Sequence, residues 1–240
     1  MTPTIHCVRH GQAYHNLSIA NHNIHDPLLT NLGEEQSRRL LSNSPALQTA
    51  DLIVSSPLKR TLYTSLLAFD SLLAAKETRI IALPELQETS DLPCDTGSPL
   101  YDLATEFAHQ PVDFSLVKPD WDSKKGKWAP SASAIEKRAQ EARTWLLQRP
   151  EREIVVVTHG GFLQYLTSNW TSTNCTEIVR AVGWANAECR SYVFSSADPG
   201  TACLVETVES RERRMGRERG LDHNEKTQLK RTATEEGLKA

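Results

Sequence analysis

The chain has 240 residues, of which 39% are hydrophobic, and its formal net charge is −3. This length and apolar content are sufficient for one large domain with its own core. The small negative charge argues against nucleic acid as a partner. No apolar run approaches the ~18 residues that a membrane span needs, so a membrane partner is not expected either.

Cysteine usage and the start of the chain indicate a reducing compartment. The five cysteines are scattered and form neither a disulfide framework nor a metal-binding spacing. The chain does not begin with a basic segment followed by an apolar one, so we expect no signal peptide. Asn16-Leu17-Ser18 is formally a glycosylation sequon, but it lies in a candidate binding site that a glycan would block. We therefore expect a cytoplasmic protein.

Strands and helices alternate from the beginning of the chain. Residues 5–8 and 52–55 are short apolar runs, which is typical of buried strands. Between them, Asn31 is followed by Glu34 at the spacing of a capping box, which predicts a helix over residues 32–41.

The same alternation continues to residue 83. Ser56-Pro57 predicts the start of a helix that carries proline in its first turn. Apolar residues then recur at helical spacing, at Leu58, Leu62, Leu66, Phe69 and Leu73. Residues 80–83 read as a third strand.

In the second half, Ser133 and Glu136 form another capping box, and the helix that it opens ends before Pro150. Residues 154–157 are all β-branched, which is typical of a buried parallel strand. A further helix and two closing strands are expected over residues 162–170, 190–194 and 202–207. The alternation predicts an α/β fold, with three α/β/α layers around a mostly parallel mixed sheet.

Two segments differ from the rest of the chain. Residues 89–132 hold five prolines without strong periodicity, and a connection of this length is usually a functional lid or a small subdomain. Residues 209–240 are rich in Arg, Glu and Lys and read as a mobile, solvated tail or a frayed helix. We expect the folded domain to cover residues 1–208.

Two histidines stand where predicted buried strands end. Arg9-His10-Gly11 follows the first strand, and His159 with Gly160 follows the strand at 154–157. In an open α/β sheet, ligands bind at the carboxyl ends of the strands. Two histidines and an arginine can therefore converge on one anionic group.

These motifs, in this order, resemble the histidine phosphatase superfamily, also called the phosphoglycerate-mutase-like fold. The resemblance covers about residues 4–195 and includes Arg9-His10-Gly11, Asn16, Ser56 to Thr61, Leu86-Gln87-Glu88 and Thr158-His159-Gly160. It implies a phosphoglycerate-mutase-like fold and hydrolysis of a small phosphomonoester through a phosphohistidine intermediate, without a cofactor.

The resemblance also implies catalytic roles for three residues. His10 is the expected nucleophile, with one ring nitrogen on the phosphorus and the other held by a carbonyl near Gly11. His159 is expected to donate to the phosphoryl oxygens, which stabilises the transition state. Glu88 is the expected proton donor, and its pKa should therefore be raised. Glu85 and Asp91 are nearby competitors for this role.

Four further residues are expected to bind phosphate. Arg9 and Arg60 can each present a planar fork to two phosphate oxygens. Asn16 matches an amide donor of the family, and Gly160 can offer a backbone N–H at a helix start. Without the resemblance, Arg60 would read as a surface arginine and Asn16 as a turn residue.

A metal site is the alternative interpretation of the histidine-rich segment near the N-terminus. His6, His15, His22 and His25 join His10 there, and Asp26 follows. Metal ligands need a common surface with supporting partners, and a strand exit and a loop do not predict one. We expect no metal.

Departures from the mutases favour a phosphatase. Gln12 replaces the glutamate that follows Arg-His-Gly in cofactor-dependent phosphoglycerate mutases, and their continuation after Glu88 is missing. Residues 26–30 and 93–98 are instead similar to fungal and plant phosphoglycerate-mutase-like proteins. A phosphomutase and a non-catalytic phosphate-binding module remain the alternatives. The sequence leaves the oligomeric state open.

The segment 89–132 also carries candidate specificity residues. Lys124, Lys125 and Lys127 lie between Trp121 and Trp128. At least one lysine could meet a second anionic or polar part of the substrate while a tryptophan closes over its apolar part. The alternative is a solvated basic loop held by two tryptophans that pack on the domain.

Overall fold

The computed structural model describes residues 2–167, 182–198, 203–216, 219–221 and 226–227. Its strands are β1 (Thr4–Arg9), β2 (Leu52–Ser55), β3 (Ile80–Ala82), β4 (Val112–Asp113), β5 (Glu153–Thr158), β6 (Val182–Gly183), β7 (Cys189–Phe194), β8 (Leu204–Glu206) and β9 (Arg219–Gly220). Its α-helices are α1 (Asn31–Arg38), α2 (Leu40–Asn43), α3 (Lys59–Lys76), α4 (Leu100–Glu106), α5 (Ala132–Leu147), α6 (Gly160–Thr167) and α8 (Val208–Arg214).

Within the described residues, the main sheet has seven strands in the order β4-β3-β2-β5-β1-β7-β8. The first five strands in this order pair in parallel, whereas β7 and β8 pair antiparallel at one edge. β6 pairs with β9 apart from this sheet. The mostly parallel mixed sheet expected from the sequence is confirmed.

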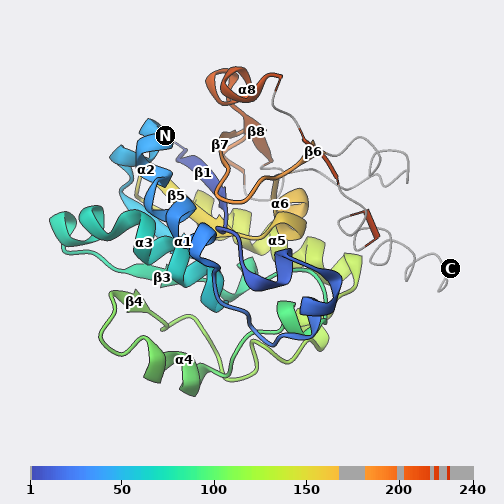
Figure 1. Cartoon of the computed structure of the whole chain (residues 1–240). Coiled ribbons are helices and arrows are strands. Elements are labelled where there is room, and N and C mark those ends of the chain that lie inside the picture. Colours follow the sequence, from blue (N-terminus) through green and yellow to red (C-terminus); the bar gives the residue numbers. More distant parts are fainter. Residues whose placement is uncertain (1, 168–181, 199–202, 217–218, 222–225, 228–240) are drawn as a thin grey trace, which may run out of the picture.

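The central strands are buried on both faces, which explains their continuous apolar runs. In β5, Ile154 and Val156 belong to the core cluster under α5 and α6. Val155 and Val157 belong to the opposite cluster, which contains α3 residues. Helices therefore cover both faces of the sheet, and the three-layer prediction is confirmed (Figure 1).

The predicted helix starts need correction. α1 begins one residue earlier than predicted, and its N-cap is Thr30, whose hydroxyl accepts from the backbone N–H of Gly33 at 3.1 Å. The capping box predicted from Asn31 is therefore wrong. Thr30 is held in this position by Gln12, whose carbonyl accepts from the Thr30 N–H at 2.9 Å. α5 likewise begins at Ala132, with Ser131 as N-cap in place of the predicted Ser133.

The start of α3 depends on a residue far away in the sequence. The helix begins at Lys59, so Pro57 precedes it and does not lie in its first turn. The Leu58 side chain cannot cap the helix; instead, the Asp26 carboxylate accepts from the Lys59 N–H at 3.0 Å. The other carboxylate oxygen accepts from the N–H of Ser98 at 2.9 Å and from its hydroxyl at 2.8 Å. Asp26 thus ties three segments together.

Residues 89–132 are a packed part of the domain. They contribute α4 and the edge strand β4, and Trp121 and Trp128 are both buried in the core. A Cβ on Gly97 would lie 2.0 Å from the Trp121 ring, so only glycine allows this packing. Two tryptophans in the core cannot close over a substrate.

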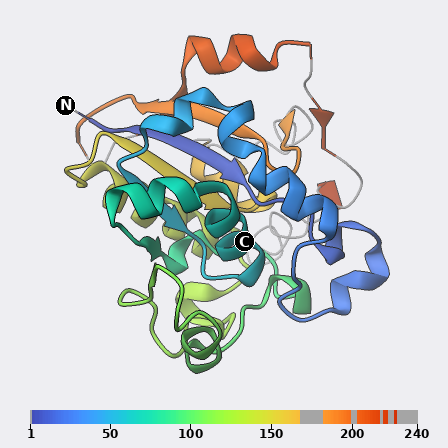
Figure 2. The same cartoon turned by 60° about the vertical axis from the view of Figure 1, so that its left-hand side comes forward.

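Beyond residue 208, where we expect the folded domain to end, α8 packs against β7 of the sheet. The Ser210 side chain is buried, and its hydroxyl accepts from the Ser191 N–H at 3.0 Å. Arg214 pairs with Glu206 of β8 at 2.6 Å, and Leu221 is buried in the core. Figures 1 and 2 show α8 and α4 at opposite ends of the sheet.

The remaining predictions meet the limits of the described residues. α6 ends at Thr167, so positions 168–170 of the predicted helix lie outside them, as does residue 202 of the last predicted strand. None of the described helices has the length and apolarity that crossing a membrane requires.

Candidate active site

The site begins at the carboxyl ends of β1, β5 and β2, which are neighbours in the sheet. Arg9 pairs with Thr158 in register, and the His10 N–H donates to the Thr158 carbonyl at 3.0 Å. His10 and His159 therefore leave the same edge of the sheet. Their ring centroids lie 5.3 Å apart.

His10 is buried, and its hydrogen bonding determines its tautomer. The Nδ1 atom lies 2.7 Å from the carbonyl oxygen of Gly11, as the sequence predicted. Because a carbonyl only accepts, Nδ1 carries the hydrogen and Nε2 keeps its lone pair. Gly11 is required for this turn, since a Cβ there would lie 2.5 Å from the Gly33 carbonyl oxygen.

Burial lowers the pKa of His10 well below its ordinary value, and the positive charges of Arg60 and Arg9 lower it further. The imidazole is therefore neutral in neutral solution. A neutral ring with a lone pair on Nε2 is the form that can attack phosphorus.

Glu88 follows β3 and is held by the start of α6. One carboxylate oxygen accepts from the N–H groups of Thr89 and Phe162, both at 2.9 Å. The other accepts from the Gly161 N–H at 3.1 Å. A Cβ on Gly161 would lie 2.6 Å from the carboxylate, so glycine is needed for this close approach.

Several groups influence the pKa of Glu88. Burial raises it above the ordinary value, and the negative charge of Asp95 raises it further. Arg60 and the backbone N–H donors oppose this rise without cancelling it. The Glu88 carbonyl accepts from Arg138 and from Lys124, each at 3.3 Å. These two basic side chains hold the backbone that positions the carboxyl group.

His159 is fully buried behind His10. Its Nε2 atom lies 2.9 Å from the Ser56 hydroxyl, which itself accepts from the Leu58 N–H at 3.4 Å. The hydroxyl hydrogen is then available for Nε2, an arrangement that leaves the ring hydrogen on Nδ1. Nδ1 is buried without a partner among the described residues. Burial lowers the pKa of His159 well below its ordinary value, and the positive charge of Arg60 lowers it further.

The two predicted phosphate-binding arginines have different surroundings. Arg9 lines the cavity, and its guanidinium donates to the Trp184 carbonyl. Arg60 is fully buried and donates to the Cys94 carbonyl at 2.5 Å and to the Asp95 carboxylate at 3.1 Å. Asp95 therefore neutralises Arg60.

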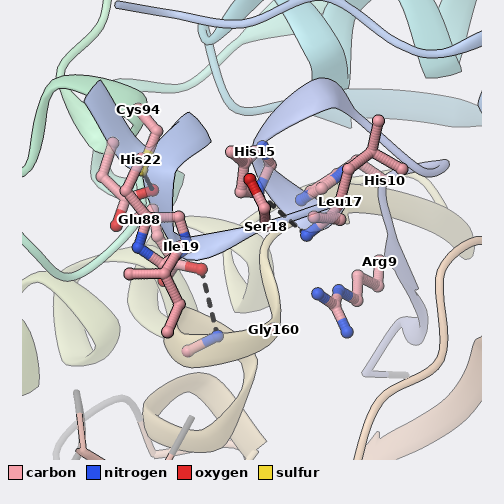
Figure 3. A pocket seen from close by; sticks show the side chains of 13 residues that line it. Arg9, His10, His15, Leu17, Ser18, Ile19, His22, Glu88, Cys94 and Gly160 are labelled. Atoms are coloured by element: carbon pink, nitrogen blue, oxygen red, sulfur yellow. Dashed lines mark hydrogen bonds between the residues drawn. The ribbon is translucent and has the colours of Figure 1, made fainter. Parts of the chain in front are cut away.

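Some of these groups line a cavity of about 230 Å³ (Figure 3). Among the residues predicted from the sequence, its wall contains Arg9, His10, Asn16, Glu88 and Gly160, but neither Arg60 nor His159. The other lining residues are His15, Leu17, Ser18, Ile19, His22, Cys94, Asp95 and Gly161.

Comparison with known proteins decides the family. The model of the histidine phosphatase superfamily, branch 1, matches residues 5–207. The chain belongs to this superfamily. The matched residues 5–207 include the predicted site residues Arg9, His10, Glu88 and His159.

Two curated relatives illustrate the range of the superfamily. A phosphoglycerate mutase-like protein of Arabidopsis thaliana is 27% identical over 232 residues, which cover 80% of this chain and 84% of the relative. A Schizosaccharomyces pombe protein named "Probable phosphatase" is 30% identical over 159 residues, covering 65% of this chain and 74% of its own.

Solved structures share the fold. The alpha-ribazole phosphatase from Shigella flexneri superposes with a TM-score of 0.55 at 20% identity, covering 85% of this chain and 95% of its own. A mycobacterial glucosyl-3-phosphoglycerate phosphatase superposes with a TM-score of 0.52 at 18% identity, covering 86% and 97%. At these identities the likeness concerns the fold alone.

Sequence reasoning missed several residues of this superfamily member. His15 stands beside the predicted Asn16, and this adjacency could have identified it. Asp95 lies in the Pro-Cys-Asp stretch, whose resemblance to fungal and plant proteins assigns it no role. Arg138 reaches Glu88 from α5, 50 positions away, and no sequence pattern signals that contact.

The lysines of the 89–132 segment separate into two kinds. Lys124 is half-buried beside Glu88. Burial and, to a smaller extent, the positive charge of Arg138 lower the pKa of Lys124 to about 7. Lys127 is exposed and paired with Glu85 at 2.5 Å and Glu141 at 2.8 Å. Of these two lysines, Lys124 is the one close to the site.

No group of three or more potential metal ligands comes together in the part of the chain that the structure describes. His6, one of the histidines considered for a metal, is buried away from the site. Its ring nitrogens instead face Ser191 and Glu153, each at 2.9 Å.

Proposed function

We propose that this protein is a phosphomonoester hydrolase that acts on a small phosphorylated metabolite through a phosphohistidine on His10. The observation that carries the proposal is a neutral His10 with its Nδ1 on the Gly11 carbonyl, beside a cavity that also holds Glu88 and Arg9. The phosphatase names of the similar proteins agree with phosphomonoester hydrolysis. The substrates stated in two of these names are those of the similar proteins and are not assigned to this chain.

In the first step, the lone pair of His10 Nε2 attacks phosphorus. The P–N bond forms as the ester P–O bond breaks, and Glu88 transfers its proton to the leaving oxygen. Arg9 and the N–H of Gly160 hold the phosphoryl oxygens, and an Nδ1–H on His159 would donate to the same group. Donors that are already in place stabilise the developing charge without reorganisation.

In the second step, water attacks the phosphorus of the phosphohistidine. The Glu88 carboxylate takes a proton from this water, the P–N bond breaks, and the electron pair returns to Nε2. Inorganic phosphate then leaves. Side chains and backbone groups carry every proton and charge in both steps, so we expect turnover in the presence of a chelator.

The first test is release of inorganic phosphate from p-nitrophenyl phosphate, with and without EDTA. The wild type should release phosphate in both conditions, and His10→Ala should not. His25→Ala is the matched control, because His25 is an exposed histidine of the same N-terminal region. Phosphate binding by the wild type without turnover would support the non-catalytic alternative.

The second test concerns the intermediate. Acid quench of the wild type with labelled substrate, followed by transfer to alkali, should reveal a phosphoenzyme that is stable in base and labile in acid. The label should map to His10. A phosphoenzyme that survives acid would overturn the mechanism. Independently of the intermediate, a panel of phosphorylated metabolites would identify the preferred substrate of an active enzyme.

A further inference from the structure

His15 lines the cavity and is not used in the chemistry above. It belongs to a 3₁₀ turn, η1 (Tyr14–Asn16), that follows the first strand. Figure 3 shows His15 and His10 among the residues that line the cavity. The ring centroid of His15 lies 5.4 Å from that of His10, about as close as the ring centroid of His159, at 5.3 Å. A third imidazole therefore stands next to the proposed nucleophile.

The hydrogen bonds around Asn16 determine which of its amide atoms faces His15. The Asn186 amide nitrogen is identified because it donates to the His10 carbonyl at 3.2 Å. The same nitrogen lies 3.3 Å from Asn16 Oδ1, which also accepts from the Ala13 N–H at 3.0 Å. Two donors meet this atom, so it is the oxygen, and the Asn16 Nδ2 group faces His15.

This orientation sets the tautomer of His15. Asn16 Nδ2 lies 3.1 Å from His15 Nε2, and an amide N–H can only donate. Nε2 therefore accepts, and a neutral ring carries its hydrogen on Nδ1. Burial lowers the pKa of His15 well below its ordinary value, and the positive charge of Arg60 lowers it further. The ring is therefore neutral.

The Nδ1–H of His15 lacks an acceptor. Nδ1 is buried and has no hydrogen-bond partner among the described residues. Leaving a buried donor unpaired is costly, so such a group needs an explanation, and a ligand that supplies the partner is one where the group belongs to a residue that lines a cavity. A phosphoryl oxygen is the acceptor that the proposed reaction brings into this cavity, and its negative charge makes it a strong one.

We propose that His15 is a further catalytic residue, whose Nδ1–H donates to an oxygen of the phosphoryl group transferred to and from His10. This role rests on the function proposed above. It also gives Asn16 a positioning role, because one hydrogen of its amide group holds His15 in the donating tautomer. The donor strengthens its bond as charge accumulates on the phosphoryl oxygens in the transition state.

Two substitutions separate the donor from the ring. His15→Phe keeps an aromatic ring and removes the N–H, whereas His15→Asn places an amide N–H near the position of Nδ1. We expect His15→Phe to lower kcat/KM for p-nitrophenyl phosphate at least tenfold and to weaken inhibition by orthovanadate. His15→Asn should recover part of both losses. His25→Phe, a change at an exposed histidine, should leave both values unchanged.

A measurement on the wild type covers the case in which the variants do not fold. Long-range ¹H–¹⁵N spectra of the imidazole rings should show His15 protonated at Nδ1, and this signal should shift when inorganic phosphate is added. Protonation at Nε2, or full activity in a folded His15→Phe variant, would overturn the inference. A wild type without turnover would contradict the proposed function, whereas the phosphate-induced shift would still test His15.

Discussion

At the scale of single residues, the charge states of His10 and Glu88 set the pH range of activity. Lowering the pH protonates His10 and removes its lone pair, and since its pKa lies well below 6.5, this loss occurs in acid. Raising the pH deprotonates Glu88, whose pKa lies above the ordinary 4.5. We expect a bell-shaped profile of kcat/KM, whose acid limb lies below pH 6.5 and whose basic limb lies above pH 4.5.

Steady-state kinetics with p-nitrophenyl phosphate across acid and neutral pH will measure this profile. An acid limb with its midpoint at or above 6.5 would contradict a buried, neutral nucleophile. The protein should first be shown to remain folded across the range by circular dichroism, so that the limbs report the active site.

Asp95 acts on two charged groups, Arg60, whose positive charge attracts phosphate, and Glu88, the proposed proton donor. It pairs with Arg60, and it raises the pKa of Glu88. Asp95→Asn removes the negative charge, so the pKa of Glu88 should fall and the basic limb of the profile should move to lower pH. Arg60 loses its neutralising partner, and inhibition by inorganic phosphate should therefore become stronger.

The matched control for Asp95 is Ser90→Ala. The Ser90 hydroxyl donates to the other Asp95 oxygen at 2.6 Å, so this variant removes a hydrogen bond and keeps the charge. Its basic limb should stay near that of the wild type. An equal shift in both variants would show that packing around Asp95, and not its charge, governs the titration of Glu88.

At the scale of elements, the start of α6 holds the proposed proton donor. Gly161→Ala would place a Cβ 2.6 Å from the Glu88 carboxylate and 3.0 Å from the Thr89 hydroxyl. The carboxylate must move, so we expect kcat to fall at least tenfold. Binding of vanadate should weaken less, because Arg9 and His10 lie on another strand end.

Gly220→Ala is the control for the glycine substitution, because nothing lies within 4 Å of the Cβ that it would add. Its kcat should equal that of the wild type. If Gly161→Ala kept full kcat, the hydrogen bonds from α6 to Glu88 would have no part in proton transfer.

At the scale of the whole molecule, the C-terminal segment contributes to the core. Leu221 is buried with residues of α5 and α6, whereas Met215 is 68% exposed. Truncating a buried leucine to alanine typically costs about 2–5 kcal/mol, so Leu221→Ala should lower the free energy of unfolding by about that amount. Met215→Ala should change it by less than about 0.5 kcal/mol.

Urea unfolding of both variants will measure the difference. Equal stability of Leu221→Ala and the wild type would place the domain boundary near residue 208, as charge alone suggested. Either result leaves the catalytic residues in place, so activity at low temperature should be retained in both variants.

The sequence by itself determined the central strands β1, β2, β3 and β5 and the points near which they end, but not the short edge strand β4. The unbroken β-branched run at 154–157 is typical of a strand buried on both faces, and this prediction placed His159 at the edge of the sheet. The predicted end of the strand at residues 5–8 placed His10 at the same edge in the same way. These inferences succeed because burial periodicity and chain direction are local properties, readable from neighbouring residues.

Only the tertiary structure decided which polar groups meet. Asp26 caps α3 from 33 positions away, and Asp95 takes Arg60 from 35 positions away. Asn16 lies next to His15, yet its orientation depends on Asn186. A hydrogen bond needs its two atoms within about 3 Å in the right direction, and residues far apart in the chain reach that geometry only after the elements have packed.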